Sequence, residues 1–500
     1  MKRMSFGELR DRSRRLAYGL REQGVGDGDR VAVMIPKGKP ELFVSAVALA
    51  RIGAVYIPFF TAFGPQAAAV RADASGAKAV ITTAEHRGKF DETRTMFTIS
   101  DGSVPKTDLP FSTIEKEGPL LEDQVKAMNP NGTDLLSIIF TSGTTGDPKG
   151  VPIPVRALES FRVYTEQALG VRKDSRYWNL ADSGWAYGWY YSVLSSLYMG
   201  RPAYALAAQF TPESTLDFIL KNDITHLAGA PTVYRALKAY VEQQPHFDYS
   251  RYNLECVSSA GEPLTPVVTE WFKDKFGVTI RNHYGQSENG MMCCDHHAGP
   301  NARDYDFPTG SMGLGMEGFT VAVLDEEHNE IHEDNKIGEL AMDVSKSPLF
   351  WFDGYWNSDK PVTNEKGYYL TGDRAHTETV NGEKVYCFDG RNDDVMLTAG
   401  YRIGPSEVED SIAELDCVLE VAVIGVPDEI KGQAMKAFVV LKPGAQVATE
   451  KDLEQQIRQH IRTHLAKHLV PSYVKVVDEL PKTDSGKIKR FTLRNQEKYL

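Results

Sequence analysis

A run rich in hydroxyl groups and glycine, TSGTTGDPKG, extends from Thr141 to Gly150, directly after the apolar segment LLSIIF. Glycine lets a backbone approach a polyphosphate closely and adopt positive φ. Hydroxyl and backbone N–H groups can donate to phosphate oxygens, and Lys149 adds a positive charge. The lysine lies beyond Pro148, so the spacing is not that of a P-loop. So dense a run after a strand pattern predicts a phosphate-binding loop in preference to a surface turn.

Three further segments carry groups that suit a nucleotide, although each alone is also typical of an ordinary loop. The run NHYGQSE at 282–288 offers a ring to stack on a base, a hydroxyl at Ser287 for phosphate and a carboxylate at Glu288 for Mg²⁺. The run LTGD ends at Asp373, a candidate partner for ribose hydroxyls. The run PKTDSGKIKR at 481–490 is basic, and a loop lysine can move onto negative charge that develops on phosphate.

The elements that must position these motifs alternate between helix and strand over the first two thirds of the chain. Ser5 and Glu8 have capping-box spacing and predict the start of the first helix. The alternation is typical of βα units around a parallel sheet. The predicted helices lie at about 5–23 and 40–52, and the predicted strands at 30–35, 54–57, 77–83 and 135–140.

From about Gly310 the pattern changes to short strands separated by turn residues: TVAVLDE, KIGELAM, GYYLTGD and KVYCFDG. This predicts an antiparallel sheet or a small barrel. A compact α+β segment follows GRNDDV, with strands VAVIGV and AMKAFVVL and a helix at about 450–468.

Composition excludes several classes of protein. The net charge of -12 over 500 residues, with no basic tract, argues against a nucleic-acid partner. The five cysteines have irregular spacing, which favours a reducing compartment over a disulfide framework. Arg51 and Gly53 interrupt the longest apolar region and Pro58 ends its pattern, so a buried helix followed by a strand is favoured over a membrane span. We expect a cytoplasmic protein.

One cluster, Cys293-Cys-Asp-His-His297, contains metal-ligating residue types. No second ligand pair stands at zinc spacing. A loop or pocket wall is therefore favoured over a metal site.

Six motifs occur in one order: TSGTTGDPKG, SSAGEP, YGQSE, YLTGD, GRNDDVMLTAGYRI and PKTDSGKIKR. In this order and spacing the chain resembles the adenylate-forming (AMP-binding) superfamily, in particular acyl-CoA synthetases. The resemblance implies an α/β fold. A large N-terminal domain of several subdomains, with mixed or parallel sheets and a small β-barrel-like part, would span 1–391. A small α+β lid would span 392–500 and move about a hinge near Asp393.

The resemblance also implies two half-reactions. A carboxylate attacks the α-phosphate of ATP and pyrophosphate leaves; the CoA thiol then attacks the acyl-adenylate and AMP leaves. ATP, Mg²⁺ and CoA are the implied co-substrates and cofactor. By resemblance, Lys487, Glu288 and Arg402 are catalytic, Glu288 is also the metal ligand, and CoA passes Gly400. The residues implied to contact ATP or AMP are Thr141, Ser142, Gly143, Thr144, Thr145, Lys149, Gly261, Glu262, Pro263, Tyr284, Gly285, Gln286, Ser287, Asp373 and Arg391.

The segment ADSGWAYGW (181–189) resembles the acyl-pocket segment of medium-chain and aryl acyl-CoA synthetases. Trp185, Tyr187, Ala230 and Gly285 are the implied pocket residues, whereas Trp189 belongs equally well to the core. Acetyl-CoA synthetases carry Trp at the position of Gly285, so a deeper pocket and a small-to-medium or aromatic acid are expected. Replacing Gly285 by Trp is accordingly expected to shift preference toward acetate.

Three alternatives remain open. A stand-alone adenylation enzyme would load a carrier protein; the chain ends soon after Lys487 with no carrier domain, which favours CoA. A luciferase-like oxygenase has no specific support. A nucleotide sensor without turnover is disfavoured by the presence of Lys487, Glu288 and Arg402. The sequence is compatible with a monomer or a homodimer.

Overall fold

The chain is described by a computed structural model, in which most residues from 3 to 497 are placed. The described residues are 3–91, 93–100, 102–117, 127–141, 148–262, 264, 266–303, 305, 307–308, 311–391, 394, 396–398, 401–428, 432–445, 447, 449–465, 469–482 and 488–497.

The first sheet has seven strands and is parallel except at one edge, where β7 pairs antiparallel with β6. Its strands, in spatial order, are β5 (Leu109–Pro110), β4 (Thr95–Ile99), β3 (Ala79–Thr83), β1 (Arg30–Met34), β2 (Val55–Pro58), β6 (Leu135–Thr141) and β7 (Lys149–Pro154). The helices along this part of the chain are α1 (Phe6–Glu22), α2 (Pro40–Arg51), α3 (Pro65–Ser75), η1 (Arg87–Lys89) and α4 (Phe111–Glu117). The predicted βα alternation is confirmed.

The predicted capping box at the start of α1 is also confirmed. The backbone N–H of Ser5 donates to the Glu8 carboxylate at 2.7 Å, and the Glu8 N–H donates to Ser5 Oγ at 3.1 Å. These two bonds satisfy backbone donors that the first helical turn leaves without partners.

The second sheet has ten strands and changes from parallel to antiparallel along its width. β8 to β11 are parallel, and the strands beyond β11 are antiparallel. The spatial order is β14 (Val321–Leu324), β15 (Gly338–Asp343), β16 (Tyr368–Val380), β17 (Glu383–Arg391), β13 (Ser311–Gly315), β12 (Gly290–Cys294), β11 (Ile280–Gln286), β10 (Cys256–Ala260), β9 (His226–Gly229) and β8 (Tyr177–Asn179). The antiparallel sheet was predicted. In the described residues its strands extend the parallel sheet and do not close into a separate barrel, because β13 pairs on one side with β12 and on the other with β17.

Helices and short turns connect the strands of this second sheet. They are α5 (Ala157–Val163), η2 (Tyr164–Ala168), α6 (Ala186–Gly188), η3 (Trp189–Leu194), α7 (Ser195–Tyr198), α8 (Pro212–Asn222), α9 (Pro231–Val241), η4 (Tyr249–Arg251), α10 (Pro266–Phe276) and η5 (Val344–Lys346).

The third sheet has five strands and belongs to the C-terminal part of the chain. Its order is β19 (Tyr401–Ile403), β18 (Met396–Thr398), β21 (Gly432–Leu441) and β20 (Val418–Asp428), and β22 (Tyr473–Val476) pairs with β21. Its helices are α11 (Pro405–Ala413), α12 (Glu450–His464) and α13 (Arg490–Glu497). The predicted compact α+β segment is confirmed, and its core is separate from those of the first two sheets.

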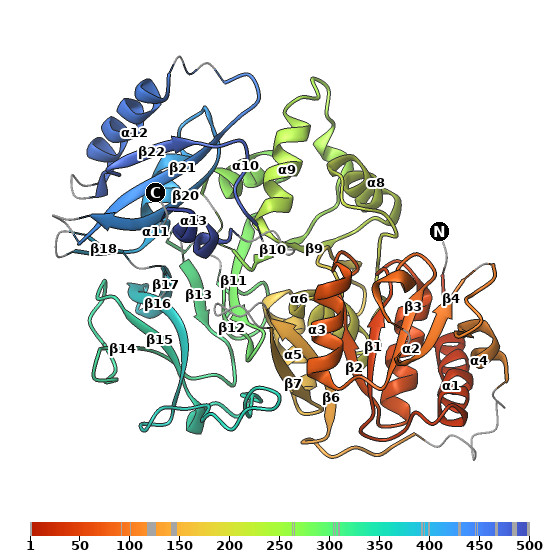
Figure 1. Cartoon of the computed structure of the whole chain (residues 1–500). Coiled ribbons are helices and arrows are strands. Elements are labelled where there is room, and N and C mark those ends of the chain that lie inside the picture. Colours follow the sequence, from red (N-terminus) through yellow and green to blue (C-terminus); the bar gives the residue numbers. More distant parts are fainter. Residues whose placement is uncertain are drawn as a thin grey trace.

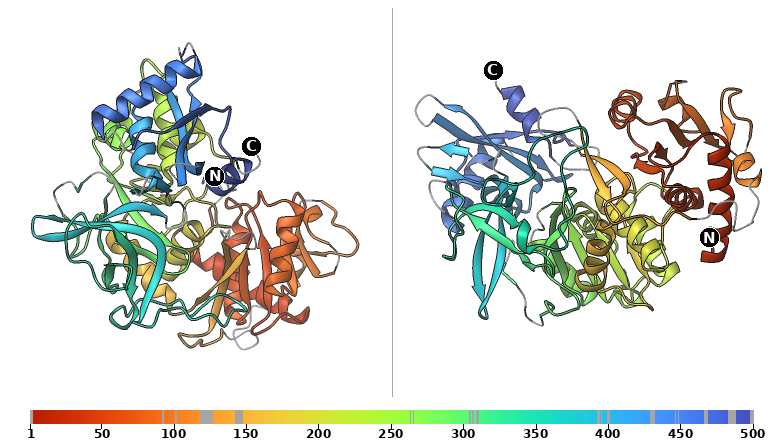
Figure 2. Two further views of the ribbon diagram at one scale, coloured as in Figure 1. Left: turned by 60° about the vertical axis from the view of Figure 1, so that its left-hand side comes forward. Right: turned by 90° about the horizontal axis from the view of Figure 1, so that it is seen from below.

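Figure 1 shows β10 to β13 (green) between the N-terminal sheet (red to orange) and the C-terminal sheet (blue). Both views in Figure 2 likewise place the N-terminal sheet and the C-terminal sheet on different sides of the molecule. Within the part of the chain that the structure describes, no helix has the length and apolarity needed to cross a membrane.

Candidate active site

Several candidate residues follow the carboxyl ends of parallel strands in the second sheet. Ser259 of β10 lies opposite Gly229 of β9, so Ala230 and Gly261 continue from neighbouring strand ends. β11, whose last residues include Tyr284, pairs with the other side of β10. Ligands of open α/β sheets bind outside this edge, because loops from adjacent strands converge there. The topology therefore brings together candidate residues that are more than fifty positions apart in the sequence.

The segment after β10 is fixed by backbone conformation and by one ion pair. Gly261 has φ of 100°, a region in which a side chain is strained. Arg235 Nη2 of α9 donates to Glu262 Oε2 at 3.1 Å, which ties this segment to the helix beside it. Pro263 lies outside the described residues.

Four candidate nucleotide residues meet where side chains from the end of β11 reach the paired strands β16 and β17. Asp373 of β16 is paired with Arg391 of β17, and Arg391 Nη1 lies 3.4 Å from Asp373 Oδ1. The Tyr284 hydroxyl donates to Asp373 Oδ2. Gln286 Nε2 donates to the same oxygen at 3.0 Å and to the Thr371 carbonyl at 2.7 Å. We call Tyr284, Gln286, Asp373 and Arg391 the carboxylate hub.

The carboxylate hub is built so that its phenol donates and its carboxylate accepts. Burial, followed by the charge of Asp373, holds the pKa of Tyr284 well above its usual value. The phenol therefore stays protonated at neutral pH. A buried carboxylate with several donors around it is fixed in orientation, as it would have to be to accept hydrogen bonds from a ribose diol.

The turn between β11 and β12 carries the other two candidates of this motif. The buried Tyr190 hydroxyl donates to the Ser287 carbonyl at 2.7 Å. The Tyr355 hydroxyl donates to Glu288 Oε1 at 2.8 Å. The backbone of Ser287 and the carboxylate of Glu288 are thus each held by an aromatic hydroxyl from elsewhere in the chain.

The candidate phosphate loop connects two strands of an antiparallel hairpin. Thr141 of β6 is paired with Lys149 of β7, and Thr141 Oγ1 donates to the Lys149 carbonyl at 3.4 Å. Ser142, Gly143, Thr144 and Thr145 lie outside the described residues. At Lys149 the chain returns into β7. A phosphate bound here would therefore depend on Lys149 and on the hydroxyl and backbone N–H groups of the loop sequence.

For the C-terminal candidates, the structure describes mainly the neighbouring backbone. Asp393, Gly400 and Lys487 lie outside them, and the side chain of Arg402 is not described. The backbone of Arg402 pairs with Leu397 in the β18–β19 hairpin. Lys482 and Ile488 form an isolated antiparallel bridge, and the Lys489 N–H donates to the Pro481 carbonyl at 2.7 Å.

The aromatic residues of the candidate acyl segment separate into two groups. Trp185 packs against Phe60 and Phe63, with ring centroids 5.4 and 5.5 Å away. Trp189 is 1% exposed and stacks on Tyr56 with centroids 4.1 Å apart. Trp189 therefore belongs to the core, whereas the half-buried Trp185 can still form part of a pocket wall.

Tyr187 ends a chain of buried hydrogen bonds whose donors can be assigned. His283 Nε2 lies 2.9 Å from the Asp295 carbonyl, which can only accept, so Nε2 carries a proton. Burial lowers the pKa of His283 to about 3, so the ring is neutral and Nδ1 accepts from the Tyr164 hydroxyl at 2.7 Å. Tyr164 then accepts from Tyr187 at 3.0 Å. Because the Tyr187 proton is used in this bond, the Tyr187 oxygen can accept a further hydrogen bond but cannot donate one.

Gly285 has no free space on the side where a side chain would begin. A Cβ there would lie 2.1 Å from the Gly290 carbonyl oxygen and 2.6 Å from Met291 Cα of β12. The β11–β12 register also shifts between Tyr284 and Gly285, so this close approach lies at an irregularity of the pairing. The glycine is required by strand packing, so its presence does not by itself indicate a deep acyl pocket.

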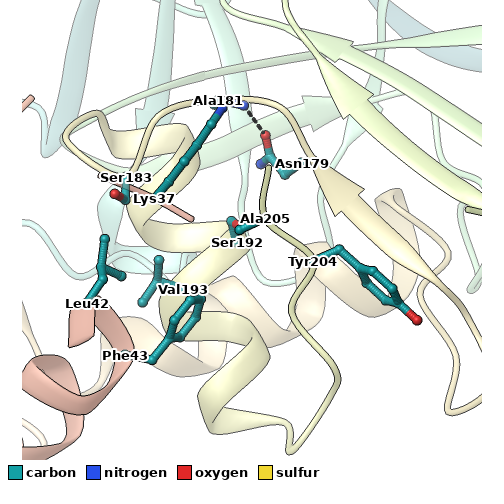
Figure 3. Close-up of a pocket in the computed structure, with 10 residues that line it drawn as sticks. All are labelled: Lys37, Leu42, Phe43, Asn179, Ala181, Ser183, Ser192, Val193, Tyr204 and Ala205. Carbon is teal, nitrogen blue, oxygen red and sulfur yellow. Dashed lines mark hydrogen bonds between the residues drawn. The ribbon is translucent and has the colours of Figure 1, made fainter. Parts of the chain in front are cut away.

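A small cavity lies beside the candidate acyl segment (181–189), as Figure 3 shows. Lys37, Asn179 and Ser183 contribute polar groups to its wall. Its volume is about 10 Å³, room for one water molecule and not for an acyl group. Lys37 Nζ donates to the Leu180 carbonyl at 2.6 Å, which ties the end of β1 to the segment that carries Trp185.

Asp295 and His297 of the cysteine and histidine cluster bond to other parts of the protein. Cys293 and Cys294 are neighbours in β12 and so point to opposite faces of the sheet. Asp295 pairs with Arg281 at 2.5 Å, and His297 Nε2 lies 3.1 Å from the Val257 carbonyl. These contacts fit the favoured interpretation as a buried wall.

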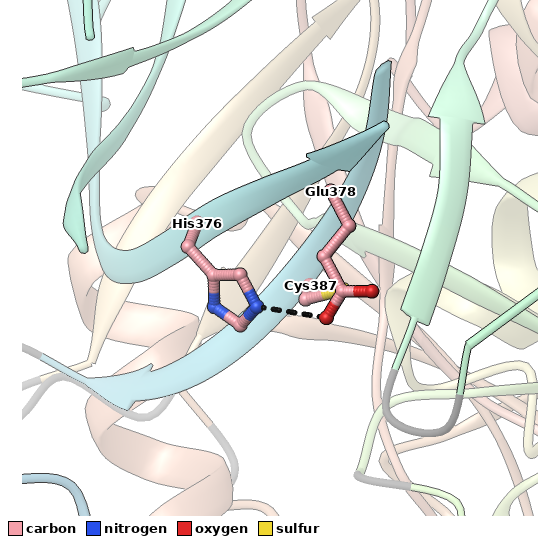
Figure 4. A group of neighbouring side chains, drawn as sticks. All are labelled: His376, Glu378 and Cys387. Atoms are coloured by element: carbon pink, nitrogen blue, oxygen red, sulfur yellow. Dashed lines mark hydrogen bonds and ion pairs between the residues drawn. The ribbon is translucent and has the colours of Figure 1, made fainter. Parts of the chain in front are cut away.

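A different group, drawn in Figure 4, brings metal-ligating residue types together on one face of the β16–β17 hairpin. His376 lies opposite Cys387, with Glu378 two residues further along β16. His376 Nδ1 is 2.7 Å from Asp389 Oδ2, and Nε2 is 3.4 Å from Glu378 Oε1. Asp389 above all, and then Cys387, raises the pKa of His376 to about 11. The protonated imidazolium donates from both nitrogens, so the described contacts of this group are those of an ion-pair network.

The His376 network predicts a pH-dependent contribution to stability. The folded pKa is raised from 6.5 to about 11, so the contribution is complete below pH 6.5 and is lost as the pH rises toward 11. His376→Gln is expected to lower the free energy of unfolding by about 1–2 kcal/mol at pH 6 and by much less at pH 10. Urea unfolding of both proteins at the two pH values measures this. An equal loss of unfolding free energy at pH 6 and pH 10 would show that His376 acts through packing alone.

Sequence reasoning did not single out Tyr190, Tyr164 or Tyr355. Tyr190 follows the acyl motif directly, yet its bond to Ser287 spans nearly a hundred residues. Tyr355 stands in the short run GYW after a glycine with φ of 128°. That glycine signals a turn, but no local pattern indicates that the tyrosine reaches Glu288.

Comparisons with known proteins agree with this arrangement. Residues 1–356 match the model for the AMP-binding enzyme family, and residues 407–487 match the model for the AMP-binding enzyme C-terminal domain. The chain is 33% identical over 507 residues to "Acyl-coenzyme A synthetase ACSM4, mitochondrial" of Rattus norvegicus, covering 99% of this chain and 84% of that protein.

Two solved structures are similar over almost the whole chain. One is a Brucella canis acyl-CoA synthetase, with 40% identity, a TM-score of 0.74 and coverage of 100% of this chain and 89% of that one. The other is a benzoate CoA ligase of Burkholderia xenovorans LB400, with 25% identity, a TM-score of 0.83 and coverage of 98% and 94%. The chain belongs to the AMP-binding enzyme family.

Proposed function

We propose that this chain is an AMP-forming acyl-CoA synthetase that acts on a small-to-medium or aromatic carboxylic acid. The observation that carries the proposal is the carboxylate hub, which brings Asp373 and Arg391 to Tyr284 and Gln286 at the carboxyl end of β11. A fixed carboxylate next to an aromatic ring suits a ribose and its base. The relatives named as acyl-CoA synthetases and as a benzoate CoA ligase support the thioester-forming activity.

ATP binding follows from the family, and Mg²⁺ and CoA are proposed with it. Mg²⁺ is commonly held by one or two carboxylates together with substrate phosphates. Glu288 offers such a carboxylate in a defined orientation, with Oε1 bonded to Tyr355. When bound, the ion would offset the repulsion between an attacking carboxylate and the polyphosphate. Lys149 at the base of the phosphate loop and, by resemblance, Arg402 and Lys487 would add positive charge.

The domain boundary is proposed near Arg391 and Asn392, with Asp393 as the hinge. The two half-reactions need different groups at one pocket, which a mobile C-terminal lid can supply. Arg391 ends β17 within the second sheet, and the third sheet begins at Met396. The proposed hinge thus lies in the short connection between two separately packed sheets.

On the acyl side, we propose that Trp185, Tyr187 and Ala230 face the acid. Trp185 supplies an apolar wall, and the Tyr187 oxygen can only accept a hydrogen bond. Acids with a hydroxyl or amino donor therefore belong in any substrate panel beside plain alkyl and aryl acids. One methylene in an apolar pocket changes binding by only about 1–3 kcal/mol, so the panel must vary length in single carbons.

The test is pyrophosphate release with ATP and Mg²⁺ across this acid panel, each acid with and without CoA. We expect one class of acid to give release that continues only when CoA is present, together with an acyl-CoA product. A single burst that CoA does not sustain would favour a carrier protein as acceptor. No release with any acid would contradict the proposal and favour a nucleotide-binding protein without turnover.

A further inference from the structure

Tyr355 connects two groups that the proposed function places around the phosphates of ATP. Its hydroxyl donates to Glu288 Oε1 at 2.8 Å. Lys149 Nζ lies 5.1 Å from the centroid of its ring, within the range of a cation–π contact. One side chain therefore contacts both the candidate metal ligand and the lysine of the phosphate loop.

The backbone around Tyr355 is anchored on both sides of this contact. The Trp356 N–H donates to the Gly150 carbonyl at 2.8 Å, directly after Lys149 in β7. Arg156 Nη2 donates to the Trp351 carbonyl at 3.1 Å. Phe352 packs edge-on against the Tyr355 ring with centroids 5.1 Å apart. These contacts hold the ring beside β7 independently of its bond to Glu288.

The turn that carries Glu288 is also anchored by packing and by a hydrogen bond. Trp351 is 1% exposed and lies 6.0 Å, edge-on, from the ring of Tyr190. Tyr190 in turn donates to the carbonyl of Ser287, the residue before Glu288. The segment around Tyr355 thus reaches the Ser287–Glu288 turn twice, once through the Tyr190 ring and once through the Tyr355 hydroxyl.

We propose that Tyr355 is a positioning residue that orients the Glu288 carboxylate for Mg²⁺ and holds the Lys149 ammonium beside the same phosphates. This proposal rests on the proposed function. A carboxylate that accepts from Tyr355 through one oxygen leaves its other oxygen available to an ion. Outer partners of metal ligands typically change metal affinity or activity by about 10–100-fold when they are removed. The hydroxyl serves the ion and the ring serves Lys149, so the two functions can be separated by substitution.

The hydroxyl is tested by Tyr355→Phe, which keeps the ring against Phe352 and Lys149. Acid-dependent pyrophosphate release is measured over a range of free Mg²⁺ at saturating ATP and acid. We expect the half-saturating Mg²⁺ concentration to rise by about 10-fold or more, with the rate largely recovered at high Mg²⁺. The KM for the acid should not change. A purely structural role would alter stability without moving the Mg²⁺ dependence.

A matched control exists in the same protein. Tyr368 also donates to a glutamate, Glu330, at 2.7 Å, and contacts none of the candidate site residues through that bond. Tyr368→Phe should leave the Mg²⁺ dependence unchanged. Combining Tyr355→Phe with Glu288→Gln should have no effect on Mg²⁺ dependence beyond that of Glu288→Gln alone, because Tyr355 is proposed to act through Glu288.

The ring is tested by Tyr355→Leu, which removes the cation–π contact as well as the hydroxyl. We expect a higher KM for ATP than in Tyr355→Phe, in addition to the altered Mg²⁺ dependence. If the unsubstituted protein releases pyrophosphate and Tyr355→Phe has the same Mg²⁺ dependence, the proposal for Tyr355 is wrong and the proposed function stands. If the unsubstituted protein releases none with any acid, the proposed function itself fails.

Discussion

Replacing Lys487 by alanine is expected to slow acyl-adenylate formation by about 10²–10³-fold, the effect of removing one preorganised group that stabilises a transition state. The first half-reaction brings a carboxylate onto the α-phosphate of ATP, and negative charge accumulates on the oxygens of the five-coordinate phosphorus. A lysine that reaches this charge stabilises the transition state more than bound ATP. ATP affinity should therefore stay within a few-fold of the unsubstituted protein. Pyrophosphate release and ATP binding, measured separately, test this expectation.

The second half-reaction provides an internal control for Lys487→Ala. When acyl-adenylate is supplied directly, CoA attacks the acyl carbon and AMP leaves with the electron pair of the acyl–oxygen bond, so no five-coordinate phosphorus forms. Thioester formation from the supplied adenylate should therefore be nearly unchanged. Lys489→Ala is the matched control for charge, because Lys489 is exposed beside the same segment. Adenylation by Lys487→Ala at the unsubstituted rate, or equal losses in both half-reactions, would contradict the assigned role.

Local sequence signals predicted those parts of the fold that depend on local physics. The capping box of Ser5 and Glu8 forms as expected because both partners are within one helical turn. The predicted strand LLSIIF forms as β6. Four consecutive residues of β6 are buried, as expected for an apolar strand that is covered on both faces. Such elements are specified by neighbouring residues, so a single sequence suffices to place them.

Features set by strand pairing and distant contacts could not be predicted in this way. The sequence separated a parallel part from an antiparallel part but gave no reason to join them, whereas β12 and β13 connect both into one sheet. The ring of Trp189 could belong to a pocket or to the core until its stack on Tyr56 was seen. Neither the partner of a buried ring nor the order of strands is encoded by local periodicity.

In the candidate site, too, some residues could be predicted from sequence motifs, and others could be found only from contacts between distant parts of the chain. Motif order brought Tyr284, Asp373 and Arg391 into one hypothesis, and the structure places them within hydrogen-bonding or ion-pair distance. Tyr355 carried no comparable signal, because its bond to Glu288 crosses 67 positions. Residues that touch a ligand fall into recognisable motifs, whereas residues that orient them are found only from three-dimensional contacts.

The structure changes the expected result for Gly285→Trp. A shift toward acetate was expected from resemblance, but a Cβ at this position would lie 2.1 Å from the Gly290 carbonyl oxygen. Relief of that overlap requires β11 and β12 to separate next to Tyr284 and Glu288. We therefore expect loss of folded protein or of all adenylation, in place of a clean change in acid preference.

Gly285→Ala isolates the backbone clash from the size of the indole. It is expected to lower the free energy of unfolding by about 3 kcal/mol, because overpacking against a backbone cannot be relieved by a rotamer change. The matched control is Gly315→Ala in β13, where a Cβ would meet its nearest atom at 3.6 Å, and a change within about 1 kcal/mol is expected. Urea unfolding compares the two variants, and acid preference is measured for each that folds. If Gly285→Trp instead remains folded and turns over acetate, then β12 must be able to move, and Gly285 borders the acyl pocket after all.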